Sequence, residues 1–97
     1  MNTVEVRCDP APDGWRCAVT VSDDRSSSIH DVTVNADHAI DLAAATDAAH
    51  VTRLVEETFD FLLEREPKES ILRTFDLAVV GQYFPDFDHE IRSRLAP

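Results

Sequence analysis

The chain is poor in glycine, in basic residues and in long apolar runs, and each shortage excludes a class of protein. Its 97 residues include only Gly14 and Gly81 as glycines, so a glycine-rich loop that cradles a phosphate cannot be built in the usual forms. No run of about 18 apolar residues is present, which argues against a membrane-spanning helix. The first residues lack the basic and apolar regions of a signal peptide, and we therefore expect a cytoplasmic protein.

Positive charge is scarce as well. Nine Lys and Arg stand against 19 Asp and Glu, which gives a formal net charge of −10. Affinity for nucleic acid comes largely from cationic contacts with phosphates, so this composition disfavours non-specific binding to DNA or RNA and to anionic lipid. Solubility is the simplest reason for such a charge. The functional interpretation is a surface that attracts a basic protein partner.

Three short runs in the first third of the chain predict antiparallel strands. They span about residues 3–8, 15–21 and 29–34, and turn-forming stretches lie at 9–14 and 22–28. Side chains alternate between faces along a strand, and one register places the apolar ones on a single face. The facing pairs expected in this register are Cys8 with Cys17, Val6 with Val19, Val4 with Val21, Val19 with Val32, Cys17 with Val34 and Val21 with His30.

The middle of the chain predicts two helices. Asn35 can cap a short helix that ends near residue 44 and places Ile40, Ala43 and Ala44 on one face. Thr46 can cap the longest helix, which runs to about residue 64. Its apolar stripe, at spacings of three and four residues, predicts a buried face formed by Val51, Leu54, Val55, Thr58, Phe59, Leu62 and Leu63.

The last third predicts three short helices. Pro67 ends the long helix and can open a helix to about Thr74, Asp76 can cap the next, and Pro85 can open the last. The length predicts a single domain over residues 1–97. Its class is α+β: a three-stranded antiparallel meander covered on one face by the long helix and the short C-terminal helices.

Three side chains on the predicted inner face of the sheet can carry chemistry. Cys8 and Cys17 face each other, so they are a candidate redox pair. The favoured interpretation is that both are reduced, small apolar residues of the core in a cytosolic protein. His30 is interpreted as a core histidine with hydrogen-bond partners.

Potential metal ligands are present, but none is spaced as in a known motif. His38 and His50 lie early in neighbouring predicted helices, and Asp86, Asp88 and His89 form the densest cluster. This cluster lacks the glycine and the spaced acids of a calcium-binding loop, and acidic residues suit the start of a helix in any case. We therefore predict no metal site and no cofactor, and keep these five residues as candidates.

Aromatic residues gather between positions 75 and 87. The tract mixes Phe75, Tyr83, Phe84 and Phe87 with Asp76, Asp86 and Asp88, which places aromatic anchors inside an acidic rim. Protein interfaces draw much of their energy from such anchors. A meander also leaves the edges of both outer strands unpaired. We predict that the four aromatic residues line an interface, with a homodimer as the simplest case. The alternative is that they attach the short helices to the long one.

No assembled set of catalytic residues is recognisable, and the preferred hypothesis is a non-enzymatic, acidic protein-binding or regulatory module. It would act as an antitoxin-like partner of a basic protein. One alternative is a small transcription regulator that binds DNA through the C-terminal helices, with Arg73, Arg92 and Arg94 on its surface. The other is a subunit of an enzyme or a metal-dependent protein.

Overall fold

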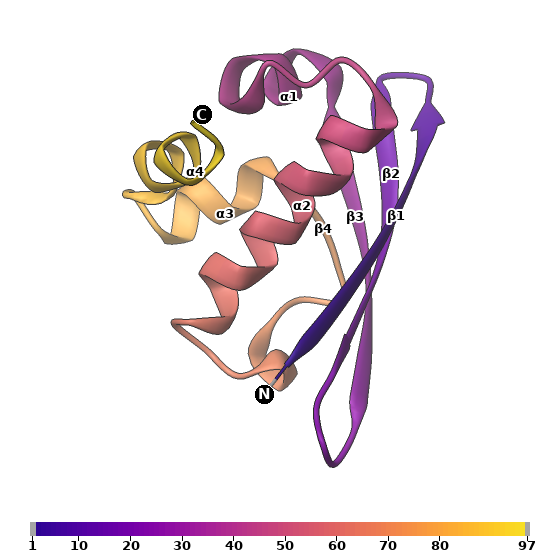
Figure 1. Cartoon of the computed structure of the whole chain (residues 1–97), viewed down its shortest axis with the longest axis vertical. Coiled ribbons are helices and arrows are strands. Elements are labelled where there is room, and N and C mark those ends of the chain that lie inside the picture. Colours follow the sequence, from indigo (N-terminus) through magenta and orange to yellow (C-terminus); the bar gives the residue numbers. More distant parts are fainter. Residues whose placement is uncertain (1, 97) are drawn as a thin grey trace.

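A four-stranded mixed sheet carries all the helices on one face (Figure 1). This computed structural model describes residues 2–96. The strands are β1 (Thr3–Ala11), β2 (Gly14–Ser22), β3 (Ser27–Asn35) and β4 (Thr74–Asp76). The helices are α1 (Ala36–Ala43), α2 (Ala48–Leu63), the short 3-10 helix η1 (Lys68–Ser70), α3 (Ala78–Tyr83) and α4 (Phe87–Leu95). The predicted α+β class, with an N-terminal meander and C-terminal helices, is confirmed.

The first hairpin has the predicted register. Cys8 faces Cys17, Val6 faces Val19 and Val4 faces Val21. The strands extend further than expected, because residues 9–11 continue β1 and only Pro12 and Asp13 form the turn. Gly14 follows with a φ of 154°, and a Cβ atom there would overlap the Val34 carbonyl oxygen. This close approach of two strands requires glycine.

The second hairpin is shifted by two residues, so its predicted register is wrong. Val19 faces His30, Cys17 faces Val32, and Val21 faces Ser28. The shift originates in the turn, where the Asp23 side chain accepts hydrogen bonds from the N–H groups of Arg25 and Ser26 at 2.8 and 2.9 Å. This tight turn lets β3 begin at Ser27. A shift by two keeps each side chain on its face, and the apolar face of β3 is still buried.

Helices α1 and α2 begin close to their predicted caps. Asn35 accepts hydrogen bonds from the first turn of α1, as predicted. Asp47, one residue after the predicted Thr46, caps α2 through a 2.9 Å hydrogen bond from the His50 N–H. The buried residues of α2 are Val51, Leu54, Val55, Thr58, Phe59, Phe61 and Leu62. The stripe is therefore as predicted, except that Phe61 joins it and Leu63 is only half-buried.

The inward face of α1 differs from the prediction. Ala39 and Leu42 are buried, whereas Ile40 is 50% exposed. Ala44 does not belong to the helix, because its left-handed backbone (φ 51°) turns the chain towards α2. In a helix this short, the direction of the chain at either end decides which face is buried.

The predicted helix over residues 67–74 is wrong. Only Lys68–Ser70 is helical, and β4 then pairs in parallel with β3. The Asp31 N–H donates to the Arg73 carbonyl at 2.6 Å, and the Leu77 N–H donates to the Thr33 carbonyl at 2.9 Å. β4 therefore covers part of one sheet edge that the sequence analysis expected to be open.

The core lies between the sheet and α2. The inner face of the sheet contributes buried side chains from β1, β2 and β3, and helices α1 and α4 close the rest. The opposite face carries no helix (Figure 1) and is largely polar, with Arg16 bonded to Asp31 at 3.0 Å and Thr33 to Asp76 at 2.8 Å. No helix within residues 2–96 is both long and apolar enough to cross a bilayer.

Candidate functional site

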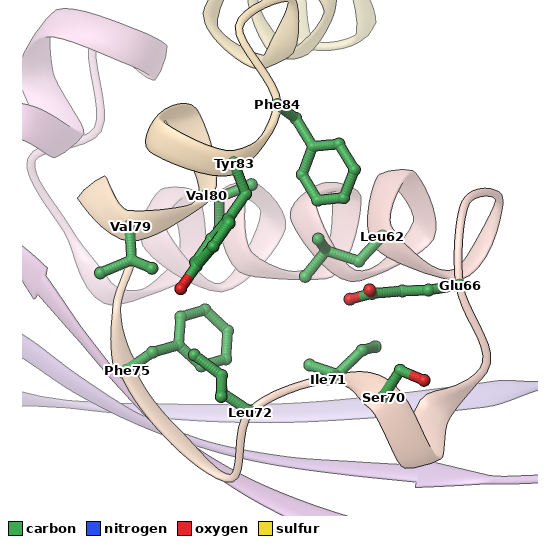
Figure 2. A pocket seen from close by; sticks show the side chains of 10 residues that line it. All are labelled: Leu62, Glu66, Ser70, Ile71, Leu72, Phe75, Val79, Val80, Tyr83 and Phe84. Atoms are coloured by element: carbon green, nitrogen blue, oxygen red, sulfur yellow. The ribbon is translucent and has the colours of Figure 1, made fainter.

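A groove of about 390 Å³ opens between α3, the end of α2 and the segment 66–75, which we call the groove segment (Figure 2). Its buried floor consists of Leu62, Ile71, Phe75 and Val80. Its sides are open, since Leu72 is 51% exposed on the groove segment and Tyr83 is 70% exposed on α3. Figure 2 shows the Tyr83 ring above Phe75 and the Phe84 ring pointing towards Leu62. This shape and lining suit an apolar side chain.

The groove segment is fixed to the sheet by the single lysine of the chain. Lys68 is only 4% exposed, and its Nζ donates to Asp23 at 2.8 Å and to Glu69. The hydrogen bonds and the charges of these two carboxylates raise the pKa of Lys68. The hydrogen bond from Lys68, followed by those from the backbone of the turn, lowers the pKa of Asp23. The ion pair thus joins the start of the groove segment to the β2–β3 turn.

His30 fixes the middle of the groove segment. Its ring is buried, with Nδ1 2.7 Å from the Leu72 carbonyl oxygen and Nε2 2.8 Å from Ser28 Oγ. A carbonyl only accepts hydrogen bonds, so Nδ1 carries the proton and donates it. The Phe59 ring packs beside the imidazole at a centroid distance of 5.3 Å. The prediction of a hydrogen-bonded core histidine is confirmed, and its partner lies in the wall of the groove.

Glu66 places a negative charge at one end of the groove. Figure 2 shows its side chain extending from the groove segment, just after the end of α2, over the apolar floor. The adjacent charges are engaged elsewhere: Arg65 with Asp86 at 3.2 Å, and Lys68 with Asp23 and Glu69. Within residues 2–96, no ion pair or side-chain hydrogen bond involves the Glu66 carboxylate. The groove therefore combines an apolar floor with one uncompensated anion.

The four predicted interface aromatics separate into two groups. Phe75, Tyr83 and Phe84 line the groove. Phe87 is fully buried and packs edge-on against Phe61 at a centroid distance of 5.2 Å. For Phe87 the interface assignment is therefore wrong. It attaches α4 to α2, which is the role that the alternative interpretation gave to all four.

The predicted metal candidates do not come together. His50 Nδ1 lies 2.7 Å from Asp47 within the cap of α2, and Asp86 pairs with Arg65. Asp88 and His89 are exposed on α4. His38 lies on α1, where its buried Nδ1 has no hydrogen-bond partner in the described chain. Among residues 2–96 no three His, Cys, Asp or Glu side chains are grouped so that they could hold a metal ion.

The two cysteines form a disulfide. Cys8 and Cys17 face each other across β1 and β2, with their Cα atoms 4.0 Å apart. The reduced pair that the sequence analysis favoured is therefore wrong for this structure, which has the oxidised form of the candidate redox pair. Both residues are buried beneath α2, so the bond belongs to the core.

Two of the three arginines expected on a DNA-binding surface, Arg92 and Arg94, are held in ion pairs. Arg92 pairs with Asp41 at 3.0 Å, and Arg94 pairs with Glu64 at 2.7 Å and with Glu90 at 3.2 Å. These pairs join α4 to α1 and α2 and neutralise its positive charge. α4 therefore presents no free basic face of the kind that a DNA-reading helix needs.

Several groove residues were not singled out from the sequence. Leu62 was assigned to the core only, Leu72 to a helix, and Glu66 to the end of α2. The available signal was the break at Pro67: a chain that leaves a helix and returns to a sheet edge leaves an unfilled space beside the helix. Comparison with protein-family models, with curated proteins and with solved structures finds no match for this chain.

Proposed function

We propose that this chain is a small acidic protein-binding module whose groove receives an apolar side chain from a basic protein. The occupant is a short segment of the partner with a leucine or phenylalanine next to an arginine or lysine. The observation that carries the proposal is the uncompensated Glu66 carboxylate beside an open apolar floor. An exposed apolar groove on a small soluble domain is a common mark of an interaction site.

The charge of the whole chain supports a basic partner. At a net charge of −10, the protein attracts cationic segments from a distance and repels acidic ones. The aromatic ring of Tyr83 and the side chain of Leu72 can then close on the apolar side chain. Anchors of this kind contribute most of the energy of an interface, whereas charges at the rim contribute mainly rate and selectivity.

The test uses peptides as defined probes. A capped peptide with phenylalanine between two arginines is titrated into the 15N-labelled protein, and amide shifts are mapped onto the chain. We expect shifts in residues 66–84, binding that weakens as salt is added, and an affinity about tenfold lower for Tyr83→Ala. Glu66→Gln should weaken the arginine peptide but leave a peptide with citrulline in place of arginine unchanged.

Two matched controls make the test decisive. Ile29→Ala removes an equally exposed apolar side chain from the uncovered sheet face, and it should leave binding unchanged. A peptide with alanine in place of phenylalanine should bind far more weakly. If that peptide binds as well as the first, or if shifts spread over the whole acidic surface, attraction is purely electrostatic and the groove proposal is wrong.

The two alternative functions have less support. DNA binding through α4 would have to break the ion pairs of Arg92 and Arg94. A role as an enzyme subunit rests on no particular feature of the described residues.

A further inference from the structure

The outer edge of β1 is unpaired. The sheet has the order β1-β2-β3-β4, and within residues 2–96 no strand lies beyond β1 (Figure 1). β4 shields part of β3 at the other margin, so β1 is the longer open edge, with nine residues. An open edge of this length is a template for another strand, since its N–H and C=O groups are ready to pair.

The backbone groups that point outward belong to the even-numbered residues of β1. The 4.0 Å Cα separation of Cys8 and Cys17 marks a facing pair that exchanges no backbone hydrogen bonds. At such positions the N–H and C=O groups point away from β2. The same therefore holds for Val4 and Val6. Pro10 occupies the next outward position and has no N–H, so it weakens that end of the edge.

The inward side chains of β1 are incompletely covered. Val4 and Val6 are half-buried, whereas Val21 and Val19, which face them on β2, are fully buried. Neither position carries the inward-pointing charge with which edge strands commonly prevent association. A further strand beside β1 would complete the burial of both valines.

We propose that the occupant of this edge is the β1 strand of a second copy, paired antiparallel about a two-fold axis at Val6. The exposed side chains of β1 are self-complementary in this register. Glu5 faces Arg7 of the partner subunit, and by symmetry Arg7 faces Glu5 of the partner subunit. The dimer thus gains two opposite-charge pairs at positions where facing side chains are close. It joins the two sheets into one of eight strands.

Other registers are less favourable. Centring the axis on Glu5 places two glutamates opposite each other, and centring it on Arg7 places two arginines opposite each other. Centring it on Cys8 brings Pro10 opposite Val6, where the missing N–H removes one hydrogen bond at each end. Only pairing about Val6 combines opposite charges with a full set of central hydrogen bonds. This surface is at the sheet margin opposite β4, away from the groove.

The test is a charge swap measured by analytical ultracentrifugation and native mass spectrometry. Glu5→Arg creates two arginine–arginine pairs in the dimer, and Arg7→Glu creates two glutamate–glutamate pairs. Each single variant should dissociate about tenfold more readily than the wild type. The double variant Glu5→Arg/Arg7→Glu should regain the dimer. An equimolar mixture of the two single variants should form heterodimers, because their charges are complementary.

Both positions are exposed, so the variants should fold, and circular dichroism verifies this. Measurements at 0.15 and 0.5 M salt separate the local pairs from the general repulsion between two chains of charge −10, which salt screens. A monomer at millimolar concentration overturns the proposal. So does a dimer that is lost in Tyr83→Ala but is insensitive to the charge swap, because that result would place the interface in the groove.

Discussion

Asp23 determines both the register of one hairpin and the position of the groove segment. Its carboxylate closes the β2–β3 turn through the backbone of Arg25 and Ser26, and it accepts a hydrogen bond from Lys68. The presence of a turn could be foreseen from the residues around it, but not the register that the turn sets. The pair with Lys68 could not, because 45 positions separate the two residues in the chain and only the complete fold brings them together.

The low pKa of Asp23 predicts a loss of stability in acid. A carboxyl group whose pKa is lower in the folded than in the unfolded state stabilises the fold at any pH above its unfolded-state pKa of about 4. This contribution disappears as the pH falls through the folded-state pKa. The same direction holds for Asp31, Asp47, Glu64 and Glu69. We expect the free energy of unfolding, measured with urea, to fall steeply below about pH 4.

Asp23→Asn should lower the stability at pH 7 and flatten this dependence below about pH 4, because the lost contribution no longer titrates. Asp24→Asn, at the exposed neighbouring position, is the matched control and should retain the slope of the wild type. Equal slopes for Asp23→Asn and wild type would show that this carboxylate contributes nothing to the pH dependence.

At the scale of elements, local sequence patterns predicted the hairpin and the helix caps that depend on residues close together in the chain. The first hairpin and the caps of α1 and α2 follow from alternation, turn residues and capping side chains. β4 could not be predicted, since Thr74–Asp76 is too short to show a period and pairs in parallel with a distant strand. The predicted register of the second hairpin was wrong by two residues, because two registers bury the same face and the turn alone selects between them.

The face of α1 provides a matched pair of substitutions. Leu42→Ala removes a buried side chain and should cost about 2–5 kcal/mol in the free energy of unfolding. Ile40→Ala, in the same helix, removes a half-exposed one and should cost less than about 1 kcal/mol. Chemical denaturation of both variants measures the difference. A larger cost for Ile40→Ala would restore the orientation that the sequence pattern suggested.

At the scale of the whole molecule, the sequence predicted a one-sided sheet and an aromatic site but not its shape. Phe75, Tyr83 and Phe84 line the groove as a group, because the short elements that carry them surround one space. Phe87 could not be distinguished from them, since a helix of two or three turns has too few residues to reveal its inward face. The floor of the groove includes Phe75 on β4, and because β4 was not predicted, the floor was not predicted either.

Because the single lysine is buried, its reactivity with an acylating reagent reports unfolding of the part of the chain around it. Acylating reagents attack the neutral amine, and in the native fold Lys68 Nζ is shielded from solvent and held protonated by two carboxylates. We expect acetic anhydride to leave Lys68 unmodified in native protein and to acetylate it fully in urea, as read by peptide mass spectrometry. Rapid acetylation without denaturant would mean that the groove segment detaches from the sheet while the remaining fold persists. Because Lys68 is the only lysine of the chain, the mass of its peptide reports how often this part of the molecule opens, without any introduced label.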